Sequence, residues 1–254
     1  MLSATQEQIC SQAGEIGAGL SAVLVNASLT HPSQSSHTDT LLDVVAEIFR
    51  TQGTAVDRVR LSQYRLAPGV YPDMTDHGWE ADDWPKMSDR ILGADICVLG
   101  TPIWLGEKSS LAQAFIEKLY AHSGQTNDKG QYLFYGKVGG CIVTGNEDGI
   151  KHVGMGVLYS MQHVGYSIPP QADAGWVGEA GPGASYGDAR DDGTRAGFDN
   201  AFTQRNTTFM AFNLMHLARL YKENGGLPAC GNIRAQWDDG SKPGWPNPEH
   251  RLDT

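Results

Sequence analysis

One stretch decides the fold of this chain: residues 96–119, ICVLGTPIWLGEKSSLAQAFIEKL. It opens with Ile96–Leu99, a short β-branched and apolar run that is typical of a buried parallel strand. From Ser110 the pattern Ser-x-x-Gln predicts a capping box, and the apolar residues after it share one helical face. A strand, a loop and a helix in this order place the loop at the carboxyl end of a sheet strand. Open α/β folds bind their ligands at that edge.

The loop between strand and helix, Thr101-Pro-Ile-Trp-Leu-Gly106, is too apolar for an ordinary surface connection. Its indole, its proline and a glycine that permits close approach suit a flat aromatic ligand. A buried connection that packs on the core would have the same composition. Taken alone, this stretch leaves both interpretations open.

A second loop of interest, residues 27–38, follows the first predicted strand, Ala22–Asn26. After the loop, apolar residues recur at helical spacing as far as Gly53, a glycine expected just beyond a helix end. The loop therefore leads into a helix N-terminus, whose free N–H groups and dipole favour an anion. The hydroxyls that would hydrogen-bond one phosphate belong to Ser28, Ser33, Ser35, Ser36 and Thr38. Caps and turns would explain one or two of these residues, but their clustering favours phosphate binding.

The type of loop excludes two familiar nucleotide sites. Neither G-x-x-x-x-G-K-[ST] nor G-x-G-x-x-G follows the first strand, which argues against a nucleotide triphosphatase and against a Rossmann dinucleotide site. A hydroxyl-lined loop without lysine suits a single monophosphate. His31 and His37 would add positive charge there when protonated.

The rest of the chain alternates strands and helices. Further strands are predicted over residues 54–61, 138–144 and 166–174, the last at the sheet edge or ending early because of Pro169 and Pro170. Further helices are predicted from Asp83, over 153–164 and over 206–224. The segments without a predicted helix or strand are 1–19, 60–81, 122–136, 175–194 and 226–254. Five strand–helix pairs without a repeat or a linker predict one α/β domain over residues 1–254, with its core at 20–225. We expect a flavodoxin-like, doubly wound sheet of five parallel strands in the order 2-1-3-4-5, with helices on both faces. In this order the loops after strands one and three meet at one crevice.

Composition argues against several classes of partner and site. The chain has 29 acidic and 19 basic side chains, and its net charge of -10 disfavours nucleic acid and anionic membrane surfaces. No apolar run is long enough to span a membrane, and residues 1–19 show no apolar stretch of a signal peptide. The four cysteines form no C-x-x-C pair; Cys97 and Cys141 lie in apolar strands and are expected to be buried and reduced. Reduced cysteines predict a cytoplasmic protein.

Three stretches together resemble the flavodoxin-like, NAD(P)H-dependent FMN reductases, over residues 20–225. Ser28 with Ser36-His-Thr38 resembles the family's first loop, which holds the FMN phosphate. Residues 101–106, followed by Ser109 and Ser110, are similar to the family's Thr-Pro-aromatic-Gly loop beside the isoalloxazine. Thr144-Gly-Asn-Glu-Asp-Gly149 resembles the third flavin loop.

The chain departs from the family pattern in two places. The first loop reads Asn26-Ala-Ser28 where Gly-Ser-x-Arg is common, so a basic phosphate partner is missing. The segment 60–81 contains no cysteine where iron–sulfur flavoproteins of the wider family carry several, so no such cluster and no metal site is expected.

The resemblance implies an enzyme that passes electrons from NADH or NADPH through FMN to a small acceptor such as a quinone or a free flavin. No side chain is expected to act as a general base, and a homo-oligomer, a dimer or a tetramer, is expected. The implied cofactor-binding residues are Ser28, Ser36, His37, Thr38, Thr101, Pro102, Ile103, Trp104, Leu105, Gly106, Thr144, Gly145, Asn146, Asp148 and Gly149.

Several alternatives remain open from the sequence. A flavodoxin-type electron carrier would also fit the acidic charge, although it needs neither the segment 60–81 nor the glycine-rich segment 175–194. These two segments can form a wall of a substrate site or a subunit contact, and both alternatives stay open. An interaction module without a cofactor is a third hypothesis. Trp104 suits either a flavin contact or a subunit contact, whereas Trp176 is more typical of core. Glu147 or Asp148 would serve as a proton donor only if it is more than a solvated loop acid.

Overall fold

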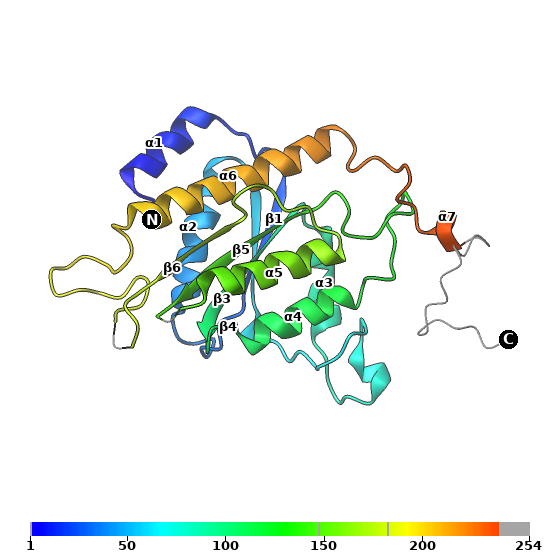
Figure 1. Ribbon diagram of the computed structural model, residues 1–254, viewed down its shortest axis with the longest axis horizontal. Helices are drawn as coiled ribbons and strands as arrows, with labels where there is room; N and C mark the ends of the chain where they lie inside the picture. Colours follow the sequence, from blue (N-terminus) through cyan, green and yellow to red (C-terminus); the bar gives the residue numbers. More distant parts are fainter. Residues whose placement is uncertain (1, 147, 182, 239–254) are drawn as a thin grey trace.

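The computed structural model describes residues 2–146, 148–181 and 183–238, and a six-stranded sheet forms its centre (Figure 1). The parallel strands are β1 (Ser21–Asn26), β2 (Ala55–Arg60), β3 (Ile96–Trp104), β5 (Val138–Gly145) and β6 (Asp173–Val177), and β4 (Glu107–Lys108) pairs antiparallel with the end of β3. The strand order is β2-β1-β3-β5-β6. Counted without β4, this is the order 2-1-3-4-5, so the predicted flavodoxin-like fold is confirmed.

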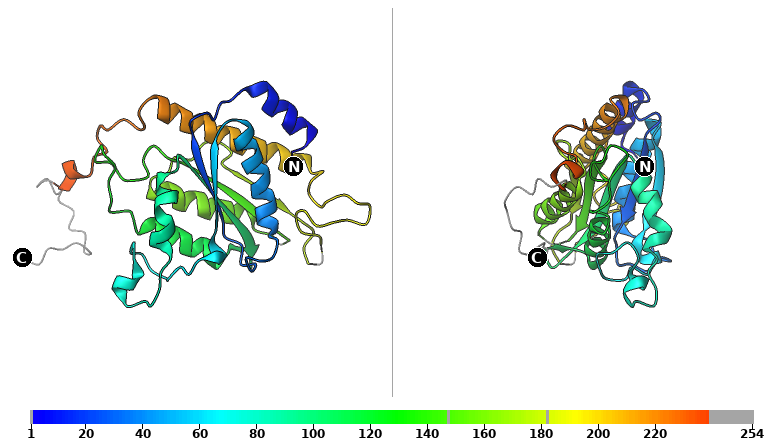
Figure 2. Two further views of the ribbon diagram at one scale, coloured as in Figure 1. Left: turned by 180° about the vertical axis from the view of Figure 1, so that it is seen from behind. Right: turned by 90° about the vertical axis from the view of Figure 1, so that its right-hand side faces the viewer.

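Helices cover both faces of the sheet (Figures 1 and 2). They are α1 (Ala4–Ala13), α2 (His37–Thr51), α3 (Trp84–Gly93), α4 (Ser110–Tyr120), α5 (Ile150–Val164), α6 (Ala201–Glu223) and α7 (Ala235–Asp238), with short 3-10 turns η1 (Leu61–Gln63) and η2 (Met74–His77). One core joins the sheet to α3, α4 and α5, and the other joins it to α1, α2 and α6. No helix in the described part of the chain is long and apolar enough to cross a membrane.

The two cores explain why the central strands are apolar throughout. In β1, Val23 and Val25 pack into the core of α3, α4 and α5, while Ala22 and Leu24 pack into the other core. Side chains alternate between the two faces of a strand, so a strand covered on both faces reads as a continuous apolar run. Cys97 and Cys141 lie in these strands as buried, free cysteines, as predicted, and burial raises the pKa of the Cys97 thiol to about 12.

Two helix ends agree with the sequence signals. Helix α2 ends before Gly53, whose φ of 82° is the left-handed conformation expected of a glycine beyond a helix end. Helix α3 begins at Trp84 with Pro85 in its first turn, and Trp84, Met87 and Ile91 are buried as predicted.

The start of α4 differs from the prediction. The N-cap is Ser109, whose Oγ accepts the Ala112 N–H at 3.1 Å, so the capping box predicted from Ser110 is wrong. Ser109 Oγ also donates to the Ala27 carbonyl at 2.6 Å, a contact with the loop after β1 that local sequence does not show. Strand β3 continues through the predicted loop because β4 folds back on it at Leu105 and Gly106, both with positive φ.

Other element boundaries also need correction. Residues 1–19 were expected to be irregular, yet α1 forms there with a Ser3–Gln6 capping box. The buried Gln6 side chain donates to Thr208 on α6 at 3.1 Å, so a polar contact rather than an apolar face holds much of this helix. Strand β6 begins after the two prolines, at Asp173, and includes Gly175 of the segment expected to be irregular; it lies at the sheet edge, as expected.

The C-terminal half of α6 matches the sequence, but the helix begins at Ala201, earlier than the predicted 206–224. Its N-cap is Asn200, whose side chain accepts the Thr203 N–H at 2.9 Å. Beyond α6 the predicted irregular tail contains the one-turn helix α7, and residues 239–254 lie outside the described residues.

Candidate functional site

The loops after β1, β3 and β5 open on one cavity at the carboxyl edge of the sheet. Its volume is about 510 Å³, within the range of roughly 300–1,000 Å³ that is usual for cofactor sites. The cavity is lined by Ser28, Leu29, Thr30, His37, Thr38, Pro102, Ile103, Trp104, Thr144, Gly145, Asn146, Gly181, Gly183, Ser185 and Tyr186. The two loops expected to meet here do meet, and the third joins them.

Most of the predicted site residues lie around this cavity. They are Ser28, His37, Thr38, Pro102, Ile103, Trp104, Thr144, Gly145 and Asn146. A hydrogen bond of 2.8 Å between Thr38 Oγ1 and Thr144 Oγ1 joins the start of α2 directly to the end of β5. Both threonines are buried, so this contact holds the first and third loops at a set distance.

The remaining predicted residues support the cavity without lining it. Ser36 is the N-cap of α2 and accepts the Asp39 N–H. Thr101 is fully buried, and its Oγ1 accepts the Ser109 N–H at 3.0 Å. Leu105 is 93% exposed at the tip of the β3–β4 turn. Gly106, Asp148 and Gly149 also lie outside the lining set, and Glu147 lies outside the described residues.

The start of α2 forms a polar end of the cavity. The N–H groups of His37 and Thr38 are in the first helical turn, where no carbonyl four residues earlier can accept them. The Ser28 hydroxyl is beside them in the lining and donates to Thr30 Oγ1 at 2.9 Å. This combination of free N–H groups, hydroxyls and a helix dipole suits a phosphate.

One wall of the cavity comes from the segment 175–194, for which the sequence left a site wall and a subunit contact both open. Here Gly181, Gly183, Ser185 and Tyr186 line the cavity, as do Leu29 and Thr30 of the first loop. The Asn146 side chain donates to the carbonyls of Gly183 and Ala184 and accepts from Ser185 Oγ at 3.3 Å. The glycine-rich composition of 175–194 was the signal that this segment could approach a site closely.

His37 ties the same segment to α2. Its Nδ1 lies 3.0 Å from the Tyr186 carbonyl and 3.6 Å from Asp188 Oδ1. A proton on Nδ1 would satisfy the carbonyl and, on a charged ring, also pair with the carboxylate. Trp176 is partly buried against the core and packs near Tyr186, with ring centroids 5.9 Å apart, as predicted for a core residue.

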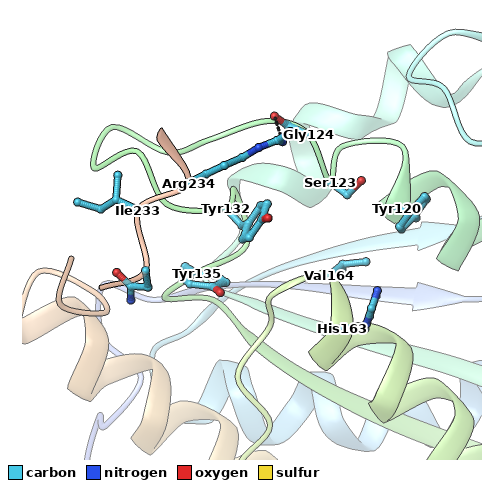
Figure 3. Close-up of a pocket in the computed structure, with 10 residues that line it drawn as sticks. Tyr120, Ser123, Gly124, Tyr132, Tyr135, His163, Val164, Ile233 and Arg234 are labelled. Atoms are coloured by element: carbon cyan, nitrogen blue, oxygen red, sulfur yellow. Dashed lines mark hydrogen bonds between the residues drawn. The ribbon is translucent and has the colours of Figure 1, made fainter. Parts of the chain in front are cut away.

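A larger cavity of about 790 Å³ lies elsewhere, where α4 and α5 end (Figure 3). Figure 3 shows Tyr120, Tyr132 and His163 around it, with Arg234 reaching toward Gly124. The carboxyl end of a helix in this fold lies at the amino edge of the sheet, so this cavity is opposite the three loops. None of the predicted site residues lines it.

Comparison with known proteins shows the family of this chain. A family model described as NADPH-dependent FMN reductase matches residues 21–172, which contain the loops after β1, β3 and β5. The chain belongs to the NADPH-dependent FMN reductase family. The resemblance stated from the three loops is therefore confirmed. FMN and NAD(P)H are the cofactor and the co-substrate of this family, as the resemblance implied.

Individual relatives extend the match beyond the family model. The chain is 32% identical over 230 residues to an 8-demethyl-8-aminoriboflavin-5'-phosphate synthase of Streptomyces davaonensis, covering 87% of this chain and 86% of that protein. The crystal structure of RosB with bound 8-demethyl-8-formylriboflavin-5'-phosphate is 30% identical, with a TM-score of 0.76 and coverage of 88% of this chain and 87% of that one.

A third relative is longer than this chain. The divalent metal cation transporter MntH of Mycobacterium bovis is 53% identical over 204 residues, or 80% of this chain. The chain spans 29% of the length of that protein.

The cavity fits FMN as this family implies. Its polar end offers N–H groups and hydroxyls for one phosphate, and its middle is apolar at Pro102, Ile103 and Trp104, as a flavin ring requires. A Cβ at Gly145 would lie 3.0 Å from Ile103 Cβ, so the glycine allows the end of β5 to pack closely against Ile103 in the cavity lining. The crevice therefore has both ends that a flavin monophosphate needs.

Proposed function

We propose that this chain binds FMN in the crevice, oxidises NADH or NADPH, and reduces a small acceptor such as a quinone or a free flavin. One observation carries this proposal: the loops after β1, β3 and β5 meet around a cavity of cofactor size. The Thr38–Thr144 hydrogen bond joins the first of these loops to the third. We assign the phosphate to Ser28 and the start of α2, and the ring to Pro102–Trp104 and Thr144–Asn146.

The chain's contribution to such a reaction is binding, orientation and protection from water. When bound, FMN supplies the centre that accepts a hydride and passes electrons on. The side chains of Ile103 and Trp104 border the ring position, and the segment 183–186 covers a further side of the cavity. No buried carboxylate or histidine is needed as a general base, because the chemistry belongs to the cofactor.

The purified protein is expected to be yellow and to release FMN on denaturation. An absorption spectrum taken before and after anaerobic addition of NADH or NADPH tests both the cofactor and the electron donor. Release of FAD, or no flavin even after reconstitution with FMN, would contradict the site assignment. Quinones, free flavins and ferric chelates form the acceptor screen; the metal chelate is included because the Mycobacterium bovis relative bears the name of a metal cation transporter.

A second candidate function treats the flavin as a substrate. The Streptomyces davaonensis relative is named for synthesis of an 8-amino flavin phosphate, and its similarity covers most of both chains. After aerobic incubation with FMN and an amine donor such as ammonium or an amino acid, the mass of the recovered flavin separates the two functions. Unchanged FMN supports the reductase, whereas a product altered at the 8-methyl group would replace it with a flavin-modifying enzyme.

Trp104→Ala is expected to slow flavin reduction by up to about tenfold, since an aromatic contact contributes about 0.5–1.5 kcal/mol. The indole is 53% exposed at the edge of the cavity, so its removal should change the melting temperature little. Stopped-flow reduction by NADPH and a melting curve give the two measurements. Normal reduction with a lowered melting temperature would assign Trp104 to packing instead.

The domain and subunit organisation of the protein is also a proposal. We propose that residues 1–254 form one domain, and that the protein is a cytoplasmic homo-oligomer, a dimer or a tetramer. Trp104, Leu105, Met155 and Tyr159 are exposed large apolar side chains that would suit a subunit contact. Light scattering on the purified protein measures the subunit number, and a monomer would contradict this expectation.

A further inference from the structure

Arg60, the last residue of β2, contacts the backbone of the loop after β1 from the adjacent strand. Its Nη1 donates to the carbonyls of Gln34 at 2.9 Å and Pro32 at 3.3 Å. Its Nη2 donates to the carbonyls of Thr30 at 3.1 Å and His31 at 3.2 Å. One guanidinium group thus donates hydrogen bonds to four backbone carbonyls of the hydroxyl-rich loop.

This arrangement sets the direction of the loop's N–H groups. In a trans peptide the N–H lies opposite the carbonyl of the same unit. Because the Thr30 and Gln34 carbonyls face Arg60, the N–H groups of His31 and Ser35 face away from it. Of the other N–H groups, that of Ser33 donates to His31 Nδ1 and that of Gln34 to the His31 carbonyl, so Arg60 and these internal bonds together fix the loop.

Of the four residues whose carbonyls Arg60 contacts, Thr30 is the one that lines the cavity. Ser28, Leu29 and Thr30 line it, whereas Arg60 does not. Arg60 therefore acts through the loop and is not a phosphate ligand itself. Its fork of N–H groups suits this task better than a lysine, whose single ammonium cannot reach four carbonyls in one plane.

We propose that Arg60 is a positioning residue that gives the site its preference for a phosphorylated flavin over riboflavin. The proposal rests on the proposed FMN site. Arg60 fixes the Thr30 backbone, and Thr30 Oγ1 accepts the Ser28 hydroxyl at 2.9 Å in the cavity lining, so the loss of Arg60 would loosen the phosphate end of the site. Riboflavin lacks the phosphate and would bind almost equally well with or without this contact.

The test compares FMN and riboflavin affinities of the intact protein, stripped of flavin, by fluorescence quenching. Arg60→Met is expected to weaken FMN binding by about tenfold or more, since hydrogen bonds to charged groups are strong, and to leave riboflavin binding within about twofold. Arg60→Lys, which keeps the charge, should give an intermediate ratio. Arg219→Met is the matched control, because Arg219 also donates to a backbone carbonyl, that of Ile16, but lies on α6 outside the lining of the cavity.

Each outcome has a distinct meaning. A collapse of the FMN-to-riboflavin affinity ratio in Arg60→Met but not in Arg219→Met supports the proposal. Equal weakening of both flavins, or no change in the ratio in Arg60→Met and Arg60→Lys, overturns it. If the unmodified protein itself does not prefer FMN over riboflavin, the phosphate site of the proposed function fails instead. Arg60→Lys keeps the test decisive even if Arg60→Met does not fold.

Discussion

Lys118→Met is expected to lower the free energy of unfolding by about 3–5 kcal/mol, because it leaves a buried carboxylate without its partner. The Lys118 ammonium lies 2.5 Å from Asp82 Oδ2, and the two side chains are 1% and 0% exposed. Methionine fills a similar volume, so the loss comes from the unpaired charge and not from a cavity. Urea denaturation of the variant measures it.

The effect should be large because Asp82 organises a whole segment. Its carboxylate also accepts the N–H groups of Ala67, Met74 and Trp84. These bonds hold the segment between β2 and α3 against α4, which contributes Lys118. An uncompensated charge at Asp82 would therefore disturb this insertion first.

Lys86→Met is the matched control for the same measurement. Lys86 pairs with Asp83, one residue from Asp82, but its side chain is 71% exposed. Exposed pairs contribute about 0–1 kcal/mol, so this variant should remain close to the unmodified protein. If Lys118→Met is no less stable than Lys86→Met, the buried pair does not hold the segment.

Sequence patterns predicted the sheet because its strands carry the strongest local signal. Residues 96–99 and 138–144 are apolar on both faces, and each is followed by a loop and a periodic helix, which predicts a parallel sheet; the order of its strands came from the flavodoxin-like fold. Helix α1 was missed because it has little apolar periodicity and is held partly by Gln6, a buried polar side chain bonded to a residue far along the chain. Such a contact leaves no local pattern.

The contrast between local sequence patterns and contacts of distant residues also explains which parts of the site were predicted. The hydroxyl loop and the Thr-Pro-aromatic loop were found because each is a continuous stretch beside a predicted strand. The wall from the segment 175–194 stayed one of two alternatives, and the contact from Arg60 was missed, because both are made through tertiary hydrogen bonds, from Asn146 and to the carbonyls of the first loop. The first loop has no arginine or lysine of its own, and Arg60 on the neighbouring strand holds its backbone.

Replacing both Ser28→Ala and Thr38→Val is expected to weaken FMN binding more than any other change at the site. Each lost hydrogen bond to a charged phosphate costs about 1.5–3 kcal/mol, and two together about 3–6 kcal/mol when they add. That corresponds to a loss of about 10²–10⁴-fold in affinity. Thr38 also loses its bond to Thr144, so the two effects need not be strictly additive.

Fluorescence titration with FMN and with riboflavin distinguishes phosphate binding from general loosening of the site. Riboflavin affinity should change far less than FMN affinity, because the ring is assigned to the other two loops. Thr40→Val is the control: Thr40 lies on α2, and its hydroxyl donates to the Ser36 carbonyl at 3.2 Å, outside the lining of the cavity. If the double variant binds FMN as tightly as Thr40→Val does, the phosphate lies elsewhere, and the start of α2 is only a structural junction between the first and third loops.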